Sequence, residues 1–149
     1  MKNKKLFGIL AIVLLILVGS YFTFFNKSTS LQEQIQEYKH DYKIKEDIES
    51  VTIMDLVDNK IMETDDTKFI DELREENITF KKLKNMNNVD GDWYNVSIYY
   101  KGHTVPLELR VYKNFILTVD QPAIYEVTGK NFIYDFIQSN TSKWENVFK

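Results

Sequence analysis

The chain contains no cysteine, so it has no disulfide and no thiol for the acylation that anchors bacterial lipoproteins. A secreted eukaryotic domain of this size often carries disulfides. A cysteine-free chain rich in Lys, Asn, Ile and Tyr is instead typical of a Gram-positive-type bacterium with AT-rich DNA. On this interpretation the sequons at Asn77, Asn95 and Asn140 are chance matches and not glycosylation sites.

Histidine and glycine are scarce, which excludes most catalytic designs. The two histidines are His40 and His103, and no His or Cys pair has the spacing of a zinc site. The five glycines form no phosphate-binding loop, and neither Gly-x-Ser-x-Gly nor Ser-x-x-Lys occurs. Segment 87–92 offers oxygen ligands for calcium, but its Asn, Asp and Gly residues are those that a turn requires. The sequence therefore predicts a protein that is not an enzyme, with no catalytic residue, metal site or cofactor.

Strong net charge is also lacking. The formal net charge is -3 at pH 7. Three of the basic residues are the lysines at positions 2, 4 and 5, so the remainder of the chain is more acidic than the whole. A net acidic domain argues against nucleic acid and against an anionic membrane surface as partners.

One long apolar run stands out against these absences. Residues 6–25 contain no charge, no proline and no amide side chain. A helix of about 20 residues spans roughly 30 Å, the thickness of the hydrocarbon core of a bilayer. We therefore predict a transmembrane signal-anchor helix over 6–25 that contacts membrane lipid. A cleaved signal peptide is the alternative, with cleavage before Leu31, although its apolar region would be shorter and an Ala-x-Ala site is absent.

The lysines around this run predict its orientation. Three of them directly precede it, namely Lys2, Lys4 and Lys5. Only Lys27 follows closely, and positive charge is retained on the cytoplasmic side. We expect a cytoplasmic basic stub at 1–5 and an extracellular C-terminal domain, in a single-pass protein of the cell membrane. Tyr21 suits the membrane interface at the far end of the run.

A short helical stalk is predicted over 26–48. Ser30 and Glu33 have the spacing of a capping box. The helix carries a narrow apolar stripe made of Leu31, Ile35, Tyr38 and Tyr42. This stripe either packs on the chain's own domain or forms a homodimer, and fewer than two heptads do not establish a dimer.

Residues 49–140 are long enough for one domain, followed by a tail at 141–149. Strands are predicted at 50–57, 60–63, 80–83, 93–100, 104–112, 115–119 and 123–127. Helices are predicted at 67–76 and 131–140, the second capped by Thr128. Grouped strands with short connections indicate an α+β fold in which one antiparallel meander sheet packs against two helices.

Aromatic residues concentrate in the predicted sheet. Because side chains alternate along a strand, one face of strand 93–100 carries Trp93, Asn95, Ser97 and Tyr99. Aromatic and polar groups together are typical of a face that recognises a peptide, a glycan or a protein. The alternative to a recognition face is that helices cover both faces of the sheet, so that these four residues are packed against a helix.

Part of the sequence resembles a known family. Three segments of the second half are similar to the YhfM-like domain: Leu107-Glu-Leu-Arg-Val-Tyr-Lys-Asn-Phe-Ile-Leu-Thr-Val119, Ala123-Ile-Tyr-Glu-Val-Thr128, and the helix from Phe132 to Ile137. Residues 50–73 are similar in plan, with a strand, a turn and an acidic-capped helix. The family comprises small exported domains of Bacillus-type bacteria, often behind a lipoprotein signal or membrane anchor. The resemblance covers about 49–140 and implies a fold and a location, but no functional residues.

Together these observations predict a non-enzymatic, membrane-tethered extracytoplasmic domain that binds an envelope or membrane-protein partner. One alternative is a single-pass ligand sensor or regulator that relays through the membrane span. A cleaved secreted protein is another, and an accessory to a cell-wall hydrolase or a degenerate enzyme is a third.

Overall fold

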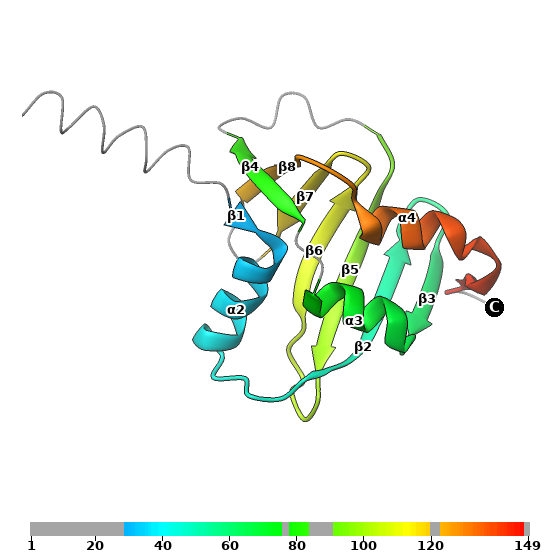
Figure 1. Cartoon of the computed structure of the whole chain (residues 1–149). Helices are drawn as coiled ribbons and strands as arrows, with labels where there is room; N and C mark the ends of the chain where they lie inside the picture. Colours follow the sequence, from blue (N-terminus) through cyan, green and yellow to red (C-terminus); the bar gives the residue numbers. More distant parts are fainter. Residues whose placement is uncertain (1–28, 76–77, 84–90, 120–122, 148–149) are drawn as a thin grey trace, which may run out of the picture.

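The computed structural model describes residues 29–75, 78–83, 91–119 and 123–147 (Figure 1). The predicted basic stub, the predicted transmembrane segment and their flanking residues Lys2, Lys4, Lys5 and Tyr21 lie outside these ranges. None of the helices within the four ranges combines the length and the apolarity that a membrane crossing requires.

In this part of the chain nine strands form one antiparallel sheet, in the order β1-β4-β8-β7-β6-β5-β2-β3-β9. The strands are β1 (Thr29–Ser30), β2 (Ile48–Asp55), β3 (Lys60–Thr64), β4 (Thr79–Leu83), β5 (Trp93–Tyr100), β6 (Leu107–Tyr112), β7 (Phe115–Thr118), β8 (Ala123–Val127) and β9 (Glu145–Asn146). Strands β5 to β8 form a meander, and the β2–β3 hairpin joins it through β5. The predicted α+β class with an antiparallel sheet is confirmed.

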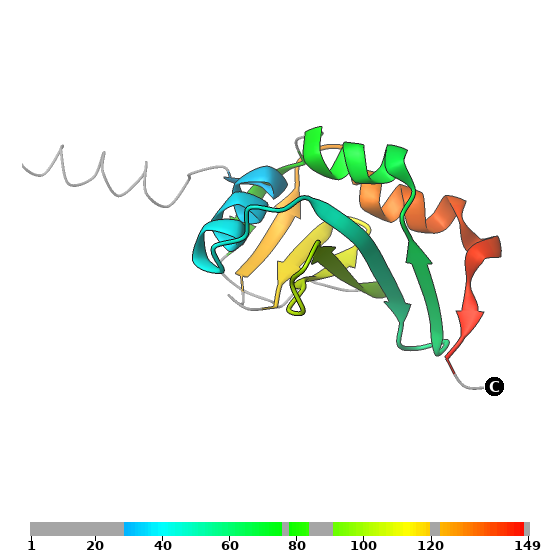
Figure 2. The same cartoon turned by 90° about the horizontal axis from the view of Figure 1, so that it is seen from below.

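Three helices of the described residues lie on the same side of this sheet (Figure 2). They are α2 (Leu31–Asp41), α3 (Thr67–Glu75) and α4 (Phe132–Ser139). The sequence predicted only two helices against the sheet, because residues 26–48 were assigned to a stalk. The sheet packs against α2 as well, since the buried side chains of α2 belong to the same core as those of the strands.

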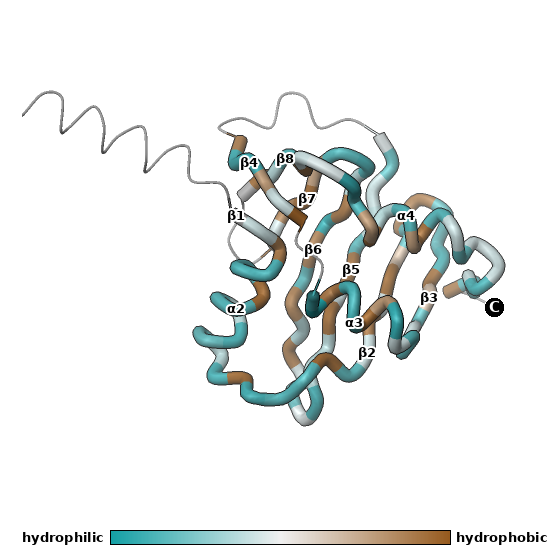
Figure 3. The backbone as a smooth tube through the Cα atoms, viewed as in Figure 1, coloured by the Kyte–Doolittle hydropathy of each residue, from teal (hydrophilic) through white to brown (hydrophobic). Residues whose placement is uncertain are grey.

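The core lies between the helices and the sheet. On β5 the side chains of Tyr94, Val96, Ile98 and Tyr100 point into it, as the two-residue period of a strand requires. Figure 3 shows hydrophobic and hydrophilic residues alternating along the strands. The opposite side of the sheet has no helix from the described residues against it (Figure 2). We call this side the open face.

Helix α2 is attached to the domain at its start, where the Leu31 N–H donates to the Ile78 carbonyl oxygen at 2.9 Å. The Ser30 hydroxyl accepts a hydrogen bond from the Glu33 backbone N–H at 3.2 Å, which confirms the predicted N-cap. The Tyr38 hydroxyl donates to the Val105 carbonyl oxygen at 3.0 Å. Three members of the apolar stripe are buried, namely Leu31, Ile35 and Tyr38. The stripe therefore packs on the chain's own domain, the first of the two alternatives, and only Tyr42 is exposed.

The caps of the other two helices differ in how well the sequence predicted them. The Asp66 carboxylate accepts from the Phe69 N–H at 3.1 Å at the start of α3, as expected for an acidic cap. Helix α4 is capped by Asn131 and not by Thr128. The prediction of Thr128 is wrong because this residue extends the β4–β8 ladder, where its N–H and hydroxyl both bond the Thr79 carbonyl.

The segment predicted as a tail contributes to the edge of the sheet. Strand β9 pairs with Lys60 and Ile61 of β3, and the Val147 N–H donates to the Asn59 carbonyl at 2.9 Å. The ring of Trp144 lies 5.9 Å from that of Tyr94. These contacts tie residues 144–147 to the domain.

Candidate partner-binding face

The four residues predicted as a recognition surface lie together on the open face. Each occupies an alternate position of β5, between the core residues of that strand. At about 3.4 Å per residue, the row from Trp93 to Tyr99 is roughly 20 Å long. Trp93, Asn95 and Tyr99 are half-buried, and Ser97 is only 6% exposed. Two aromatic side chains therefore stand at the ends of a row with a small polar residue near its centre.

Strand register decides which neighbours flank this row. On the β2 side, Tyr99 lies opposite Ser50, Ser97 opposite Thr52 and Asn95 opposite Met54. On the β6 side, Trp93 lies opposite Tyr112, Asn95 opposite Arg110 and Ser97 opposite Glu108. All of these neighbours share the open face, because directly paired residues point to the same side of a sheet. The three central strands thus form one continuous mixed surface.

Trp93 is the centre of an aromatic and cationic cluster on this surface. Its ring stacks on that of Tyr112 with centroids 6.3 Å apart. The guanidinium carbon of Arg110 lies 4.9 Å from the centroid of the Trp93 ring, the geometry of a cation–π contact. Nothing in the local sequence joins Arg110 or Tyr112 to Trp93. Only the β5–β6 register brings the three together.

The open face becomes apolar toward β7 and β8. Leu117 lies opposite Arg110 and also opposite Ile124, which in turn lies opposite Leu83. Leu117 and Ile124 are each 7% exposed, yet neither belongs to the core cluster beneath the helices. The consecutive apolar residues at 115–117 and 123–125 were the signal for this second apolar layer, because a strand with apolar residues on both faces shows no alternation.

Titratable groups with a displaced pKa lie away from the open face. Burial raises the pKa of Tyr94 and of Tyr125, both on the core side. Glu46 has a lowered pKa because its carboxylate bonds the His103 ring, with Oε2 and Nε2 2.9 Å apart. In the four described ranges, no three His, Cys, Asp or Glu side chains come close enough to hold a metal ion. The open face therefore offers stacking, hydrogen bonding and apolar contact, which are the interactions of a binding surface.

Comparison of the chain with models of protein families, with curated proteins and with solved structures finds no match in any of the three. The resemblance to the YhfM-like domain stays a prediction.

Proposed function

We propose that this chain is a membrane-tethered extracytoplasmic domain of a Gram-positive-type bacterium. It is non-enzymatic and binds an envelope or membrane-protein partner through the open face. The observation that carries the proposal is the row of Trp93, Asn95, Ser97 and Tyr99 on a side of the sheet that no helix of the described residues covers.

The composition of the open face supports a protein partner. A solvated sheet face usually carries polar side chains in alternation with the core. Here Trp93, Tyr99 and Tyr112 bring large rigid contact areas, and Arg110 stacks on one of them. Trp, Tyr and Arg are the residue types most enriched at interaction hot spots. A guanidinium held on an aromatic ring also keeps its N–H groups available for a carboxylate or a carbonyl of the partner.

The distance between the apolar run and the folded domain supports a partner at the membrane. The run ends at Phe25 and α2 begins at Leu31, with Leu31 already in the core. The connecting residues 26–30 span at most about 18 Å even when fully extended. On this proposal the domain stays close to the bilayer surface, because α2 packs on the domain and adds no reach.

Site-specific crosslinking on intact membranes tests the open face. The full chain with Trp93→Ala and Tyr99→Ala is compared with wild type for crosslinking to neighbouring proteins. Each lost hot spot costs more than about 1 kcal/mol, so the yield should fall about tenfold or more. Val57→Ser, in the exposed β2–β3 turn, is the matched control and should crosslink like wild type. An unchanged yield in the double variant, with an unchanged thermal melt, shows that the open face is not the binding surface.

A single-pass sensor is the second candidate, favoured by the position of α2. This helix directly follows the connecting residues and lines a pocket, so a ligand there would act next to the proposed span. Exchange of residues 6–25 for an unrelated transmembrane helix separates the two functions. A tethered binder keeps partner crosslinking after the exchange, whereas a sensor loses its ligand response. The mature N-terminus tests tethering itself, since a start at Leu31 means cleavage.

A further inference from the structure

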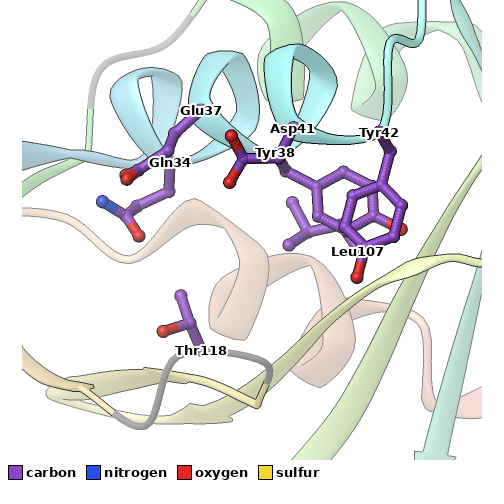
Figure 4. Close-up of a pocket in the computed structure, with 7 residues that line it drawn as sticks. All are labelled: Gln34, Glu37, Tyr38, Asp41, Tyr42, Leu107 and Thr118. Carbon is purple, nitrogen blue, oxygen red and sulfur yellow. The ribbon is translucent and has the colours of Figure 1, made fainter.

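A pocket of about 240 Å³ lies between α2 and the sheet (Figure 4). It is on the side opposite the open face, because its residue Leu107 belongs to the core and Thr118 lies opposite the core residue Leu109. Side chains of α2 and of its C-cap residue Tyr42 form one wall, and Leu107 and Thr118 contribute from β6 and β7. A water molecule occupies about 30 Å³ of liquid volume, so the pocket has room for a small organic group. The proposed binder function uses the open face and leaves this pocket without a role, and the sensor alternative requires a ligand in it without saying which chemistry that ligand has.

Two tyrosine rings form its aromatic part. The rings of Tyr38 and Tyr42 have centroids 4.5 Å apart and planes tilted by 33°. Tyr38 is held in place by the hydrogen bond to Val105 and by stacking on Tyr100 at 6.0 Å. Tyr42 is 48% exposed and forms the outer edge. A fixed ring and an accessible ring therefore border the same space.

Two carboxylates, one helical turn apart, make the pocket negative. Glu37 and Asp41 both line it, and like charges at this spacing repel each other. Within the described chain Glu37 takes part in no ion pair, and Asp41 contacts only the exposed His40 ring, at 3.4 Å. Asp41 also ends α2, where the helix dipole adds negative potential.

The negative potential reaches the floor of the pocket. The Tyr125 hydroxyl lies 3.5 Å from the side-chain oxygen of Gln34, another lining residue. Burial raises the pKa of Tyr125, and the negative charge of Glu37 raises it further. The ammonium of the nearby Lys39 lies over the Tyr100 ring, 5.7 Å from the centroid, and is not part of the lining.

We propose that this pocket binds an organic cation, an ammonium or guanidinium group on a short apolar stem. The stem packs against Leu107 and the Tyr38 ring, while the charge lies between the Tyr42 ring and the two carboxylates. Aromatic faces and carboxylates both attract cations and disfavour anions. The same chemistry is offered by a lysine or arginine side chain of a protein and by a free alkylamine. The site is separate from the open face, so the failure of either proposal leaves the other standing.

The probe is n-butylammonium, titrated into the full chain in micelles of a non-ionic maltoside detergent with ¹³C-labelled tyrosine rings. Signals of Tyr38 and Tyr42 should shift, with an affinity about tenfold higher than that for n-butanol, the neutral analogue of the same length. A lysine-containing tripeptide and its norleucine counterpart form a second pair. Stronger binding of the lysine peptide than of butylammonium identifies a protein side chain as the ligand, and the reverse order identifies a free amine.

Variants separate charge from shape. Glu37→Gln with Asp41→Asn should weaken butylammonium binding about tenfold, since both carboxylates are lost. Asp71→Asn with Glu75→Gln removes the same charge from an exposed turn of α3 and should leave binding unchanged. Tyr42→Phe should bind like wild type because the aromatic face is kept, and Tyr42→Leu should not. Equal binding of butanol and butylammonium, or unaltered binding by the Glu37/Asp41 variant, overturns the proposal.

Discussion

Phe69 of α3 and Phe136 of α4 stack face to face, with ring centroids 3.9 Å apart and planes 11° from parallel. Phe69 also meets the ring of Phe132 edge-on, at 6.3 Å. Phe69 is fully buried, whereas Phe136 is half-buried beneath Lys143, whose ammonium lies 5.7 Å from the ring centroid. The two helices are therefore joined to each other above the sheet by aromatic contact.

This arrangement predicts unequal effects at the two positions. Phe69→Ala should lower the free energy of unfolding by about 3–5 kcal/mol, because it removes a fully buried ring and leaves a cavity. Phe136→Ala should cost about 2 kcal/mol, since the ring keeps partial access to solvent and mainly loses its stacking. Denaturant unfolding of the full chain in detergent measures both values. Equal costs would contradict the difference in burial.

Helix α2 should behave as part of the domain and not as a free stalk. Leu31→Ala is expected to destabilise the whole domain by about 2–5 kcal/mol, because Leu31 is completely buried in the shared core. Gln36→Ala, on the exposed side of the same helix, should change stability by less than about 0.5 kcal/mol. Both variants are compared by the thermal melt of the sheet. An unaltered melt in the Leu31 variant means that α2 folds independently.

Two tyrosines of β5 should respond in opposite directions to loss of the hydroxyl. In the described part of the protein the buried Tyr100 hydroxyl has no hydrogen-bond partner, so Tyr100→Phe should stabilise by about 1 kcal/mol. The Tyr94 hydroxyl accepts from the Gln138 amide at 2.9 Å, so Tyr94→Phe should destabilise by about 1 kcal/mol. Denaturant midpoints give the signs. A loss of stability in the Tyr100 variant would show that its hydroxyl is satisfied, for example by a buried water.

Asn131 should not tolerate a carboxylate, although Asp is generally as good a helix cap as Asn. Its Oδ1 caps α4, while its Nδ2 donates to the carbonyl oxygens of Tyr112 at 2.9 Å and Lys113 at 3.3 Å. Asn131→Asp places a negative oxygen against these two carbonyls and should cost about 2–3 kcal/mol. The reverse exchange at the start of α3, Asp66→Asn, should stay within about 0.5 kcal/mol. Similar costs for the two exchanges would rule out the special role of Nδ2.

The contact between Glu46 and His103 predicts a small loss of stability in acid. The pKa of Glu46 is lower in the folded state because the carboxylate bonds the His103 ring. The contact therefore stabilises the folded state fully above the ordinary pKa of a glutamate. This stabilisation is lost as the pH falls through the lowered pKa of Glu46. Wild type should have a higher free energy of unfolding than Glu46→Gln at neutral pH, and this difference should disappear in acid. Glu49→Gln, an exposed position nearby, is the control, and a pH-independent difference would argue against this linkage.

Local patterns in the sequence were enough for much of the secondary structure. The alternation along 93–100 separated the residues that face the core from those on the open face, because strand geometry relates positions two apart. Ser30 was predicted as a cap and an acidic cap was expected before α3, because a cap bonds an N–H only three residues away, as Ser30 and Asp66 do. Strand β6 was predicted to begin at residue 104 but begins at Leu107. The reason is Pro106, which has no N–H to donate to the ladder.

Contacts between distant segments were beyond the reach of such patterns. The sequence showed a narrow stripe on residues 31–42, but its period is the same for a dimer and for a helix packed on its own sheet. Burial of Leu31 and Tyr38 in the domain decided between them. Thr128 was predicted as a helix cap from its neighbours in the sequence. Its actual partner is Thr79, 49 positions away, and a pattern of neighbouring residues does not reveal such a pairing.

By itself the sequence determined the apolar run, the absence of the common catalytic motifs, the α+β class and the two faces of β5. These depend on composition and on neighbours within a few residues, whose spacing is set by backbone geometry. Only the tertiary structure decided that Arg110 lies on Trp93, that one side of the sheet is left open, and that α2 closes a negative pocket. Each of these depends on strand register and helix placement, which come from packing the whole core at once and not from any one segment.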